Sequence, residues 1–559
     1  MKLEEKVGEL LKAKKNVIRH VTGEFQRVYK AKDENLNYEK ELNAQLHKLK
    51  KMRQKYMDMY TDDLITREEL NEKIGGTKQE IERLENELKM VAYHLTKGEQ
   101  LETILNRTFK EIEDISDVHQ MTNAQLKRII QKIEVDKDGK WYWTYGGDYG
   151  PKDVPSFGNF CCNGLVNAVR EPHPHLLEVK KIYQNIKSTL IDKKNLTVRV
   201  KNWFDFSDLN EYILHWKVTG DDGTVLAEGN KEVACEPHAT VELTLGAVQL
   251  PKTIREAYLD LGWTRKKSTP LVDTAWEIAY DQFVLPASGK VWNGKPSEAG
   301  KTTFEVDENT GALKSLCPVT ISLFRPATDN DNRDRMGAKL WRKAGLHTLT
   351  QKVVSLKESK TSATAQVNIL NVTGKKVGDA TLEYTLNHNG SLKVQTTFQP
   401  DTTWVKSIAR LGLTFEMNDT YGNVTYLGRG EHETYIDRNQ SGKIGIYTTT
   451  PEKMFHYYVI PQSTGNRTDV RWVKLADDSG KGCWIESDSP FQFSALPFSD
   501  LLLEKALHIN DLERNGRITV HLDAKQAGVG TATCGPGVLP PYLVPLGKQT
   551  FTFTIYPVK

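Results

Sequence analysis

The sequence predicts a multidomain protein in which an α-helical arm precedes a mainly β region. All eleven tryptophans lie at or after Trp141, and the first proline is Pro151. The first 140 residues carry 28 Lys/Arg and 27 Asp/Glu. A proline-free, charge-dense stretch is typical of long helices, whereas the Gly-, Pro- and Thr-rich remainder alternates apolar and polar residues as β-strands do. A chain of 559 residues is expected to form roughly three or four domains.

Apolar residues in the arm, residues 1–134, follow the seam of a coiled coil. They recur every three or four positions between charged residues, the spacing of helices that pair with one another. The seam positions are Leu3, Val7, Leu10, Val17 and Val21, then Leu42, Leu46, Leu49 and Tyr56, then Ile81, Leu84, Leu88, Val91 and Leu95. This pattern predicts a helical hairpin followed by a short helix, and it predicts self-association of the chain.

The arm resembles the C-terminal coiled-coil region of large serine recombinases. The likeness covers residues 1–139 and is carried by KLKKMRQKYMDMYTDDLITREEL within 48–88 and by MTNAQLKRIIQKIEVDKDGK at 121–140. In that family the region mediates contacts between subunits and follows a zinc ribbon. The first 140 residues contain no CxxC pair, so no zinc ribbon is expected. A generic charged coiled coil is the alternative, and either way the arm is an interaction element.

The β region resembles the C-terminal half of glycoside hydrolase family two β-galactosidases. Residues 141–187 contain YGGDYG, FCCNGLV and PHP, motifs that end the catalytic (β/α)8 barrel of that family. The resemblance therefore implies a barrel remnant over 135–183, an immunoglobulin-like sandwich over 184–290 and the small-chain β-sandwich over 291–559. We interpret the chain as a chimera whose two parts are joined near residues 134–140. Insertion of a mobile element into a glycosidase gene and an error in assembling the gene sequence would both produce such a junction.

Local patterns in these segments agree with β-sandwiches. Leu196, Val198 and Val200 alternate with polar residues, as do residues 212–218. Asn389-Gly390 separates two alternating runs, which is a strong hairpin signal, and Asn515-Gly516 precedes another such run. The motifs at 323–331 and 427–438 carry the likeness to the small-chain domain.

The pair of carboxyl groups that a retaining glycosidase requires is missing from the sequence. Such enzymes hold an acid/base and a nucleophile about 5–5.5 Å apart. In the family these are glutamates in Gly-Asn-Glu and Cys-Glu-Tyr-type motifs upstream of YGGDYG, and this chain has neither. Its Asn-Glu pairs at 71–72, 86–87 and 210–211 are interpreted as surface pairs. We therefore expect no catalytic residue and no turnover by the chain alone.

Part of a substrate pocket is implied by the resemblance. Phe160 and Asn163 match positions that hold sodium beside the 6-hydroxyl of the sugar, through a backbone carbonyl and an amide oxygen. The remaining protein ligand lies upstream in the family and is absent here. The alternative is that Phe160 belongs to a core and Asn163 forms a turn. Magnesium is also a cofactor of the family, but the sequence offers no ligands for it.

Three weaker features of the sequence have structural interpretations. His173-Pro-His175 is interpreted as a helix start, and the charged cluster around Arg325, Asp329 and Asp331 as either a site or a loop-stabilising ion-pair network. Cys534 follows the Gly-Val-Gly stretch where some family members have a tryptophan that stacks on the substrate, so that contact is not expected. A free cysteine there is expected to pack as a small apolar residue.

The composition of the chain limits which partners and which cellular compartment are expected. The net charge is +3, which gives no general argument for binding nucleic acid, and no apolar run is long enough for a membrane span. Six cysteines are too few for a disulfide framework, so a reducing cytoplasm is expected. Three hypotheses remain: a β-galactosidase-family chain that is inactive alone, a complementing subunit that docks on a large catalytic chain and meets a β-galactoside, and an oligomeric remnant without function.

Overall fold

The structure is a computed structural model that divides into two units, residues 1–135 and 136–559. In the first unit it describes residues 38–59, 61–62, 66, 74, 77, 80–81, 83–85 and 87–88. In the second it describes 142–558 apart from 150, 152, 297–298, 301–303, 315–316 and 334–336. The seam positions from Leu3 to Val21, together with Val91 and Leu95, lie outside the described residues.

The described part of the first unit is helical. Residues 38–59 form one helix, and Leu42 and Leu84 are buried against each other, with Leu46, Leu49 and Leu88 packed around them. The Tyr38 hydroxyl donates to Glu87 Oε1 at 2.5 Å. Two of the predicted seam segments therefore meet, while the extended coiled coil stays a prediction because most of its length lies outside the described residues.

The second unit begins with a short segment of little regular structure. It contains the 3₁₀ turn η2 (Gly158–Cys162) and the helix α5 (Pro174–Ile182). His173 precedes α5 and Pro174 occupies its first position, where the missing N–H of proline has no helical partner to lose. The interpretation of His173-Pro-His175 as a helix start is therefore confirmed.

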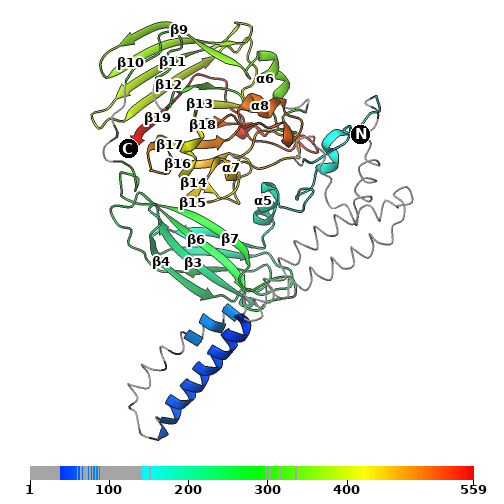
Figure 1. The fold of residues 1–559 in the computed structure, drawn as a ribbon, viewed down its shortest axis with the longest axis vertical. Coiled ribbons are helices and arrows are strands. Elements are labelled where there is room, and N and C mark those ends of the chain that lie inside the picture. The colour runs from blue at the N-terminus through cyan, green and yellow to red at the C-terminus, as the bar shows by residue number, and fades with distance from the viewer. Residues whose placement is uncertain are drawn as a thin grey trace. The chain divides into compact units, whose positions relative to one another are not determined.

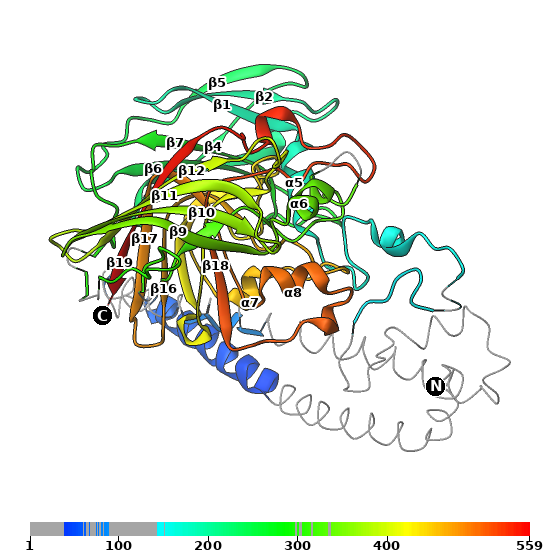
Figure 2. The same ribbon diagram turned by 90° about the horizontal axis from the view of Figure 1, so that it is seen from above.

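Two antiparallel sheets follow and form a small sandwich (Figure 2). One sheet has the order β1-β2-β5, with β1 (Ile186–Asp192), β2 (Thr197–Asn202) and β5 (Thr240–Thr244). The other has the order β4-β3-β6-β7, with β3 (Tyr212–Gly220), β4 (Val225–Glu232), β6 (Glu256–Arg265) and β7 (Glu277–Pro286). The alternation predicted for Leu196, Val198 and Val200 is confirmed, since all three are at most 1% exposed in the core between the sheets.

A twelve-stranded antiparallel sheet system forms the rest of the unit (Figure 1). Its path runs β15-β14-β16-β17-β19-β12-β11-β10-β9, and β13 and β18 pair off this path, with β8 against β13. The first strands are β8 (Thr320–Ser322), β9 (Leu349–Glu358), β10 (Ser362–Asn371), β11 (Lys376–Leu386), β12 (Leu392–Pro400) and β13 (Arg410–Asn418). The later strands are β14 (Asn423–Gly430), β15 (Lys443–Thr449), β16 (Arg467–Ala476), β17 (Gly482–Leu496), β18 (Arg517–Gln526) and β19 (Gln549–Val558). Three short helices connect them: α6 (Ala338–Ala344), α7 (Pro451–Met454) and α8 (Asp500–Lys505).

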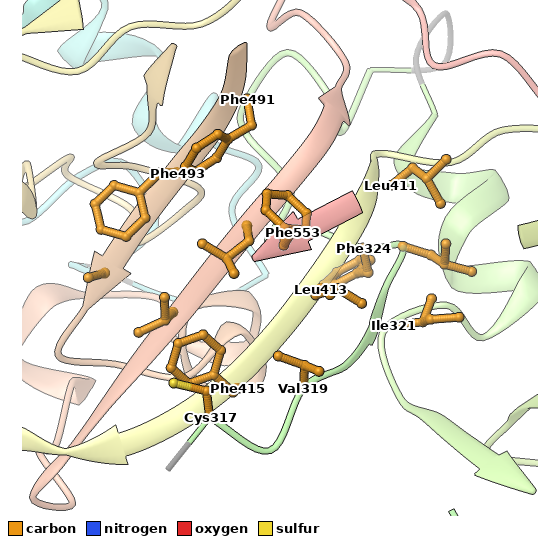
Figure 3. Packing of buried hydrophobic residues seen from close by; sticks show 14 of the residues in the cluster. Cys317, Val319, Ile321, Phe324, Leu411, Leu413, Phe415, Phe491, Phe493 and Phe553 are labelled. Atoms are coloured by element: carbon orange, nitrogen blue, oxygen red, sulfur yellow. The ribbon is translucent and has the colours of Figure 1, made fainter. Parts of the chain in front are cut away.

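One large apolar core holds this sheet system together. Figure 3 shows phenylalanine side chains of β13, β17 and β19 facing one another, with Phe493 and Phe553 fully buried. Burying a side chain of this size stabilises the fold by about 1.5–3 kcal/mol. Because β13, β17 and β19 are far apart in the sequence, this core fixes the long-range arrangement of the loops between the strands.

The two Asn-Gly predictions have different outcomes. Asn389-Gly390 is the turn between β11 and β12, with Leu386 opposite Leu392 and a Gly390 φ of 79°, so that hairpin is confirmed. Asn515-Gly516 does lead into β18, which pairs antiparallel with β17, the preceding strand in the chain, and also with β13. The prediction of a tight hairpin there is wrong, because α8 and a further 3₁₀ turn occupy the connection from β17.

In the described part of the chain, none of the helices combines the length and the apolar character of a membrane span.

Candidate functional site

The predicted sugar-contacting residues lie on the η2 turn. Phe160 is 49% exposed, and Asn163 is exposed at the C-terminal end of the turn. The expectation of a core Phe160 therefore does not hold, and Asn163 ends the turn as the alternative expected. The carbonyl oxygen of Gly158 accepts from the N–H of Gly146 at 3.0 Å, and a Cβ on Gly146 would lie only 2.9 Å from that oxygen. The YGGDYG motif therefore packs its backbone closely against η2.

One side-chain contact joins the η2 turn to the large sheet system. Asn159 Nδ2 donates to Asp329 Oδ2 at 2.6 Å, and the N–H of Asp329 donates to Gln462 Oε1 at 3.3 Å. The loop that carries Asp329 is itself fixed by Arg325, whose guanidinium binds Asp331 in a bidentate manner at 2.9 and 3.0 Å. The η2 turn is thus attached to a rigid support, although its own apolar side chains remain exposed.

The charged cluster around Arg325 is an ion-pair network and not an open site. Arg325 and Asp331 are 0% exposed, and the guanidinium also donates to the carbonyl oxygens of Ala527 and Gly528. A buried pair needs this complete set of hydrogen bonds to offset its desolvation. Asp334 and Arg335, which follow this cluster in the sequence, lie outside the described residues.

The metal ions that the resemblance implies are not supported by a sufficient donor set. Phe160 and Asn163 offer two neutral oxygens on an open turn, fewer than a hard cation usually takes from its surroundings. Among the residues that the structure describes, no group of three or more His, Cys, Asp or Glu side chains could hold a metal ion. No magnesium site can therefore be assigned to the described residues, and the sodium site at Phe160 and Asn163 stays a prediction.

A second cluster, which the sequence did not single out as a site, attaches α5 to the large sheet system. Its centre is Glu433, which is 3% exposed and accepts hydrogen bonds from Arg438, from the Tyr458 hydroxyl at 2.8 Å and from the N–H of Gly465 at 2.7 Å. Burial alone would raise the pKa of Glu433, but the Arg438 guanidinium and these hydrogen bonds lower it overall. Glu433 is therefore a buried carboxylate. We call Glu433, Arg438, Tyr458, His456 and His173 the Glu433 cluster.

Histidine rings connect this cluster to the start of α5. His173 is 4% exposed, its Nδ1 lies 2.8 Å from His456 Nε2, and its ring stacks on Tyr458. Burial, with the neighbouring His456 and His175, lowers the pKa of His173 to about 4, and burial also lowers the pKa of His456. Both rings are therefore neutral at physiological pH.

The body of α5 makes polar contacts on two sides. Glu178 accepts from the N–H of Gln440 at 3.1 Å and from the N–H and hydroxyl of Ser441 at 2.9 and 2.7 Å. On the other side, Lys181 Nζ lies 2.7 Å from Asp281 Oδ1 on β7. Figure 1 shows α5 between the small sandwich and the strands β14 and β15. The helix is therefore held between the two β modules by hydrogen bonds and charges.

Those members of the Asn-Glu pairs that the structure describes lie at the surface, as the sequence predicts. Asn210 and Glu211 are exposed, and Glu211 pairs with Arg265 at 3.3 Å. Glu87 accepts from Tyr38 and pairs with Arg83. Residues 71–72 and Asn86 lie outside the described residues.

Sequence reasoning missed the Glu433 cluster and misjudged one cysteine. The stretch 427–438 was used only as a mark of likeness, although a glutamate and an arginine inside a mostly buried loop are a local signal of an internal ion pair. His456 and Tyr458 come from a separate loop, so their meeting with Glu433 depends on the long-range fold. Cys534 is exposed, and the expectation that it packs as an apolar residue is wrong.

Three family models match successive parts of the chain. "Glycosyl hydrolases family 2, TIM barrel domain" matches residues 24–188, "Beta-galactosidase, domain 4" matches 198–286, and "Beta galactosidase small chain" matches 298–555. The barrel-domain match begins inside the helical arm and therefore overlaps the region that resembles recombinases. None of the three models alone matches half of the chain.

Several β-galactosidases are similar to the chain over most of its length. The β-galactosidase of Priestia megaterium is 31% identical over 427 residues, which cover 70% of this chain and 40% of the relative. Those of Actinobacillus pleuropneumoniae and Aeromonas hydrophila are 26% and 28% identical, with 71% and 70% of this chain and 41% of each relative covered. The chain thus spans about two fifths of the length of these relatives.

Likeness to solved structures is weak. The crystal structure of HI1317 aligns with 54% of this chain and 95% of its own at a TM-score of 0.24 and 11% identity. The exo-chitosanase CsxA of Amycolatopsis orientalis aligns with 58% of this chain and 27% of its own at a TM-score of 0.17 and 10% identity. The relation to known proteins therefore depends on sequence.

Proposed function

Because the chain is a β-galactosidase-like protein of glycosyl hydrolase family 2, we propose that it supplies the C-terminal part of a β-galactosidase and does not turn over sugar alone. The observation that carries the proposal is the apolar surface of residues 149–169. Its exposed side chains are Tyr149 (62%), Val154 (59%), Phe157 (92%), Phe160 (49%), Leu165 (42%), Val166 (41%) and Val169 (44%). A short segment that exposes so many large apolar groups has the character of an interface.

The occupant of this surface is a chain or domain that carries the missing part of the barrel. Barrel strands bury their side chains against neighbouring strands and helices, so a barrel end alone leaves such groups uncovered. The Glu433 cluster and α5 hold the segment in place before any partner arrives. With the partner bound, Phe160 and Asn163 contact a β-galactoside and contribute to a sodium site, and the partner supplies both catalytic carboxyl groups.

Complementation tests this proposal. The purified chain is assayed with a chromogenic β-galactoside and sodium and magnesium, alone and after mixing with the N-terminal portion of the Priestia megaterium β-galactosidase that it does not match. We expect activity only in the mixture, and we expect Leu165→Lys to reduce it. Turnover by this chain alone would contradict the proposal.

A second proposal concerns the arm. We infer that residues 1–134 form a coiled coil of recombinase type joined to the glycosidase part near residues 134–140, and that it lets the chain self-associate. The buried contact of Leu42 with Leu84 supports an apolar seam. Light scattering is expected to give a mass above the monomer, and Leu42→Lys is expected to lower it. Monomer mass for the unaltered chain would contradict this inference.

We propose a reducing cytoplasm as the location of the chain, on the evidence of its cysteines. None of the six forms a disulfide, and the sulfurs of Cys317 and Cys483 are 3.5 Å apart. This supports a reducing cytoplasm as the location.

A further inference from the structure

Two adjacent thiols stand on the exposed η2 turn. Cys161 is exposed, Cys162 is half-buried, and their sulfur atoms are 3.6 Å apart. Cys161 Sγ also lies 3.9 Å from the carbonyl oxygen of Gly158, a weak contact within the same turn. The sulfurs are therefore placed as a pair before any ligand arrives.

The other four cysteines provide internal comparisons. Cys235, Cys317 and Cys483 are buried, and Cys534 is exposed but has no second thiol within bonding contact. Cys317 and Cys483 are as close to each other as the η2 pair, but they are only 2% and 1% exposed. Only the η2 pair combines two close sulfurs with access from solvent.

The short distance between the two sulfurs determines which kind of ligand they can bind together. A metal that binds two thiolates in a line, such as mercury(II) or copper(I), needs them on opposite sides and further apart. A pyramidal trivalent centre binds two sulfurs close together on one side, and soft thiols prefer such soft acceptors. We propose that Cys161 and Cys162 form a dithiol site for monosubstituted trivalent arsenicals.

The reaction at this site is a condensation and not an oxidation. Phenylarsine oxide loses its oxygen, two arsenic–sulfur bonds form, and both thiol hydrogens leave with that oxygen as one water molecule. Arsenic stays trivalent throughout, so no oxidant is consumed. Burial and the neighbouring Cys161 raise the pKa of Cys162 to about 11, so exposed Cys161 attacks first and Cys162 closes the ring.

Exposed aromatic rings beside the dithiol favour an aryl substituent. Phe157 is 92% exposed, and the rings of Phe157 and Phe160 are 6.5 Å apart at a tilt of 51°. Offset or tilted aromatic contacts add about 0.5–1.5 kcal/mol. The phenyl group of the arsenical is therefore held better than a methyl group at the same arsenic.

Stoichiometric labelling of the full 559-residue chain tests the site. Phenylarsine oxide is added at one equivalent, and intact mass and free-thiol number are measured before and after. We expect one phenylarsenic group per chain, the loss of two reactive thiols and reversal by 2,3-dimercaptopropanol. Cys161→Ser and Cys162→Ser should each weaken binding roughly a hundredfold or more, because the second thiol acts at a high effective concentration.

Control variants show whether the arsenical binds at the η2 cysteines. Cys534→Ser should leave labelling unchanged, and Phe157→Ala should weaken phenylarsine oxide more than methylarsine oxide. Iodoacetamide alkylation of Cys161 in the unlabelled chain confirms that the turn is accessible. Labelling that persists in Cys161→Ser, or alkylation of Cys161 without any arsenical adduct, would overturn the proposal.

Discussion

Residues 142–183 and the large sheet system differ in how far their apolar side chains are buried. The sheet system buries Phe491, Phe493 and Phe553 in one core, whereas the 142–183 segment exposes Phe157 and Phe160. The segment is held by polar contacts: the Glu433 cluster lies at the start of α5, and Asp148 of the YGGDYG motif lies 2.9 Å from His508. The difference supports our proposal that the segment is one half of an interface, whereas the sheet system buries its own apolar side chains.

The largest expected effect contrasts two phenylalanines. Phe493→Ala should lower the free energy of unfolding by about 3–5 kcal/mol, because it opens a cavity in the core. Phe157→Ala should change it by about 0.5 kcal/mol or less, because its ring is exposed. Equilibrium urea unfolding followed by tryptophan fluorescence measures both. A similar loss in the two variants would break the comparison, since it would place Phe157 in a core.

A smaller loss of stability is expected when the Glu433 cluster, which contacts the start of α5, is altered. Glu433→Gln should lower the free energy of unfolding by about 2–3 kcal/mol, because Arg438 stays buried without its charged partner. The matched control is Glu452→Gln, whose exposed pair with Arg514 should be worth less than about 1 kcal/mol. Limited proteolysis should also cut residues 142–183 faster in Glu433→Gln. Equal proteolysis rates in both variants would mean that the cluster does not hold the segment.

The smallest expected effect is the change in stability that one buried histidine contributes over one pH unit. Burial lowers the pKa of His173 and of His432 to about 4, below the ordinary value of 6.5. The unfolded chain therefore binds protons that the folded chain does not, and stability falls as the pH drops from 6.5 toward 4. The loss is at most about 1.4 kcal/mol per pH unit for each histidine.

Urea unfolding at pH 6.5 and 5.5 measures this slope, and His173→Gln should make it shallower. Stability that is constant or greater at pH 5.5 would show that the histidines are not buried in the neutral form.

Local features of the fold were predictable, and features that join distant segments were not. The turn at Asn389-Gly390 was predictable because its two strands are neighbours in sequence. The connection into β18 was not, because α8 and a 3₁₀ turn separate β17 from Asn515-Gly516, and β18 also pairs with β13, which is distant in the sequence. Asn163 could be placed at a turn from the sequence. The contacts that hold residues 142–183 could not, because the long-range fold brings Glu433 and His456 together.

The most direct test of the central claim is hydrolysis of a chromogenic β-galactoside by the purified 559-residue chain with sodium and magnesium, beside Phe160→Ala. If the chain presents only part of a sugar site, neither protein turns over the substrate. Activity in the unaltered chain that is lost in Phe160→Ala would contradict the account, because catalytic carboxyl groups would then have to act within this chain.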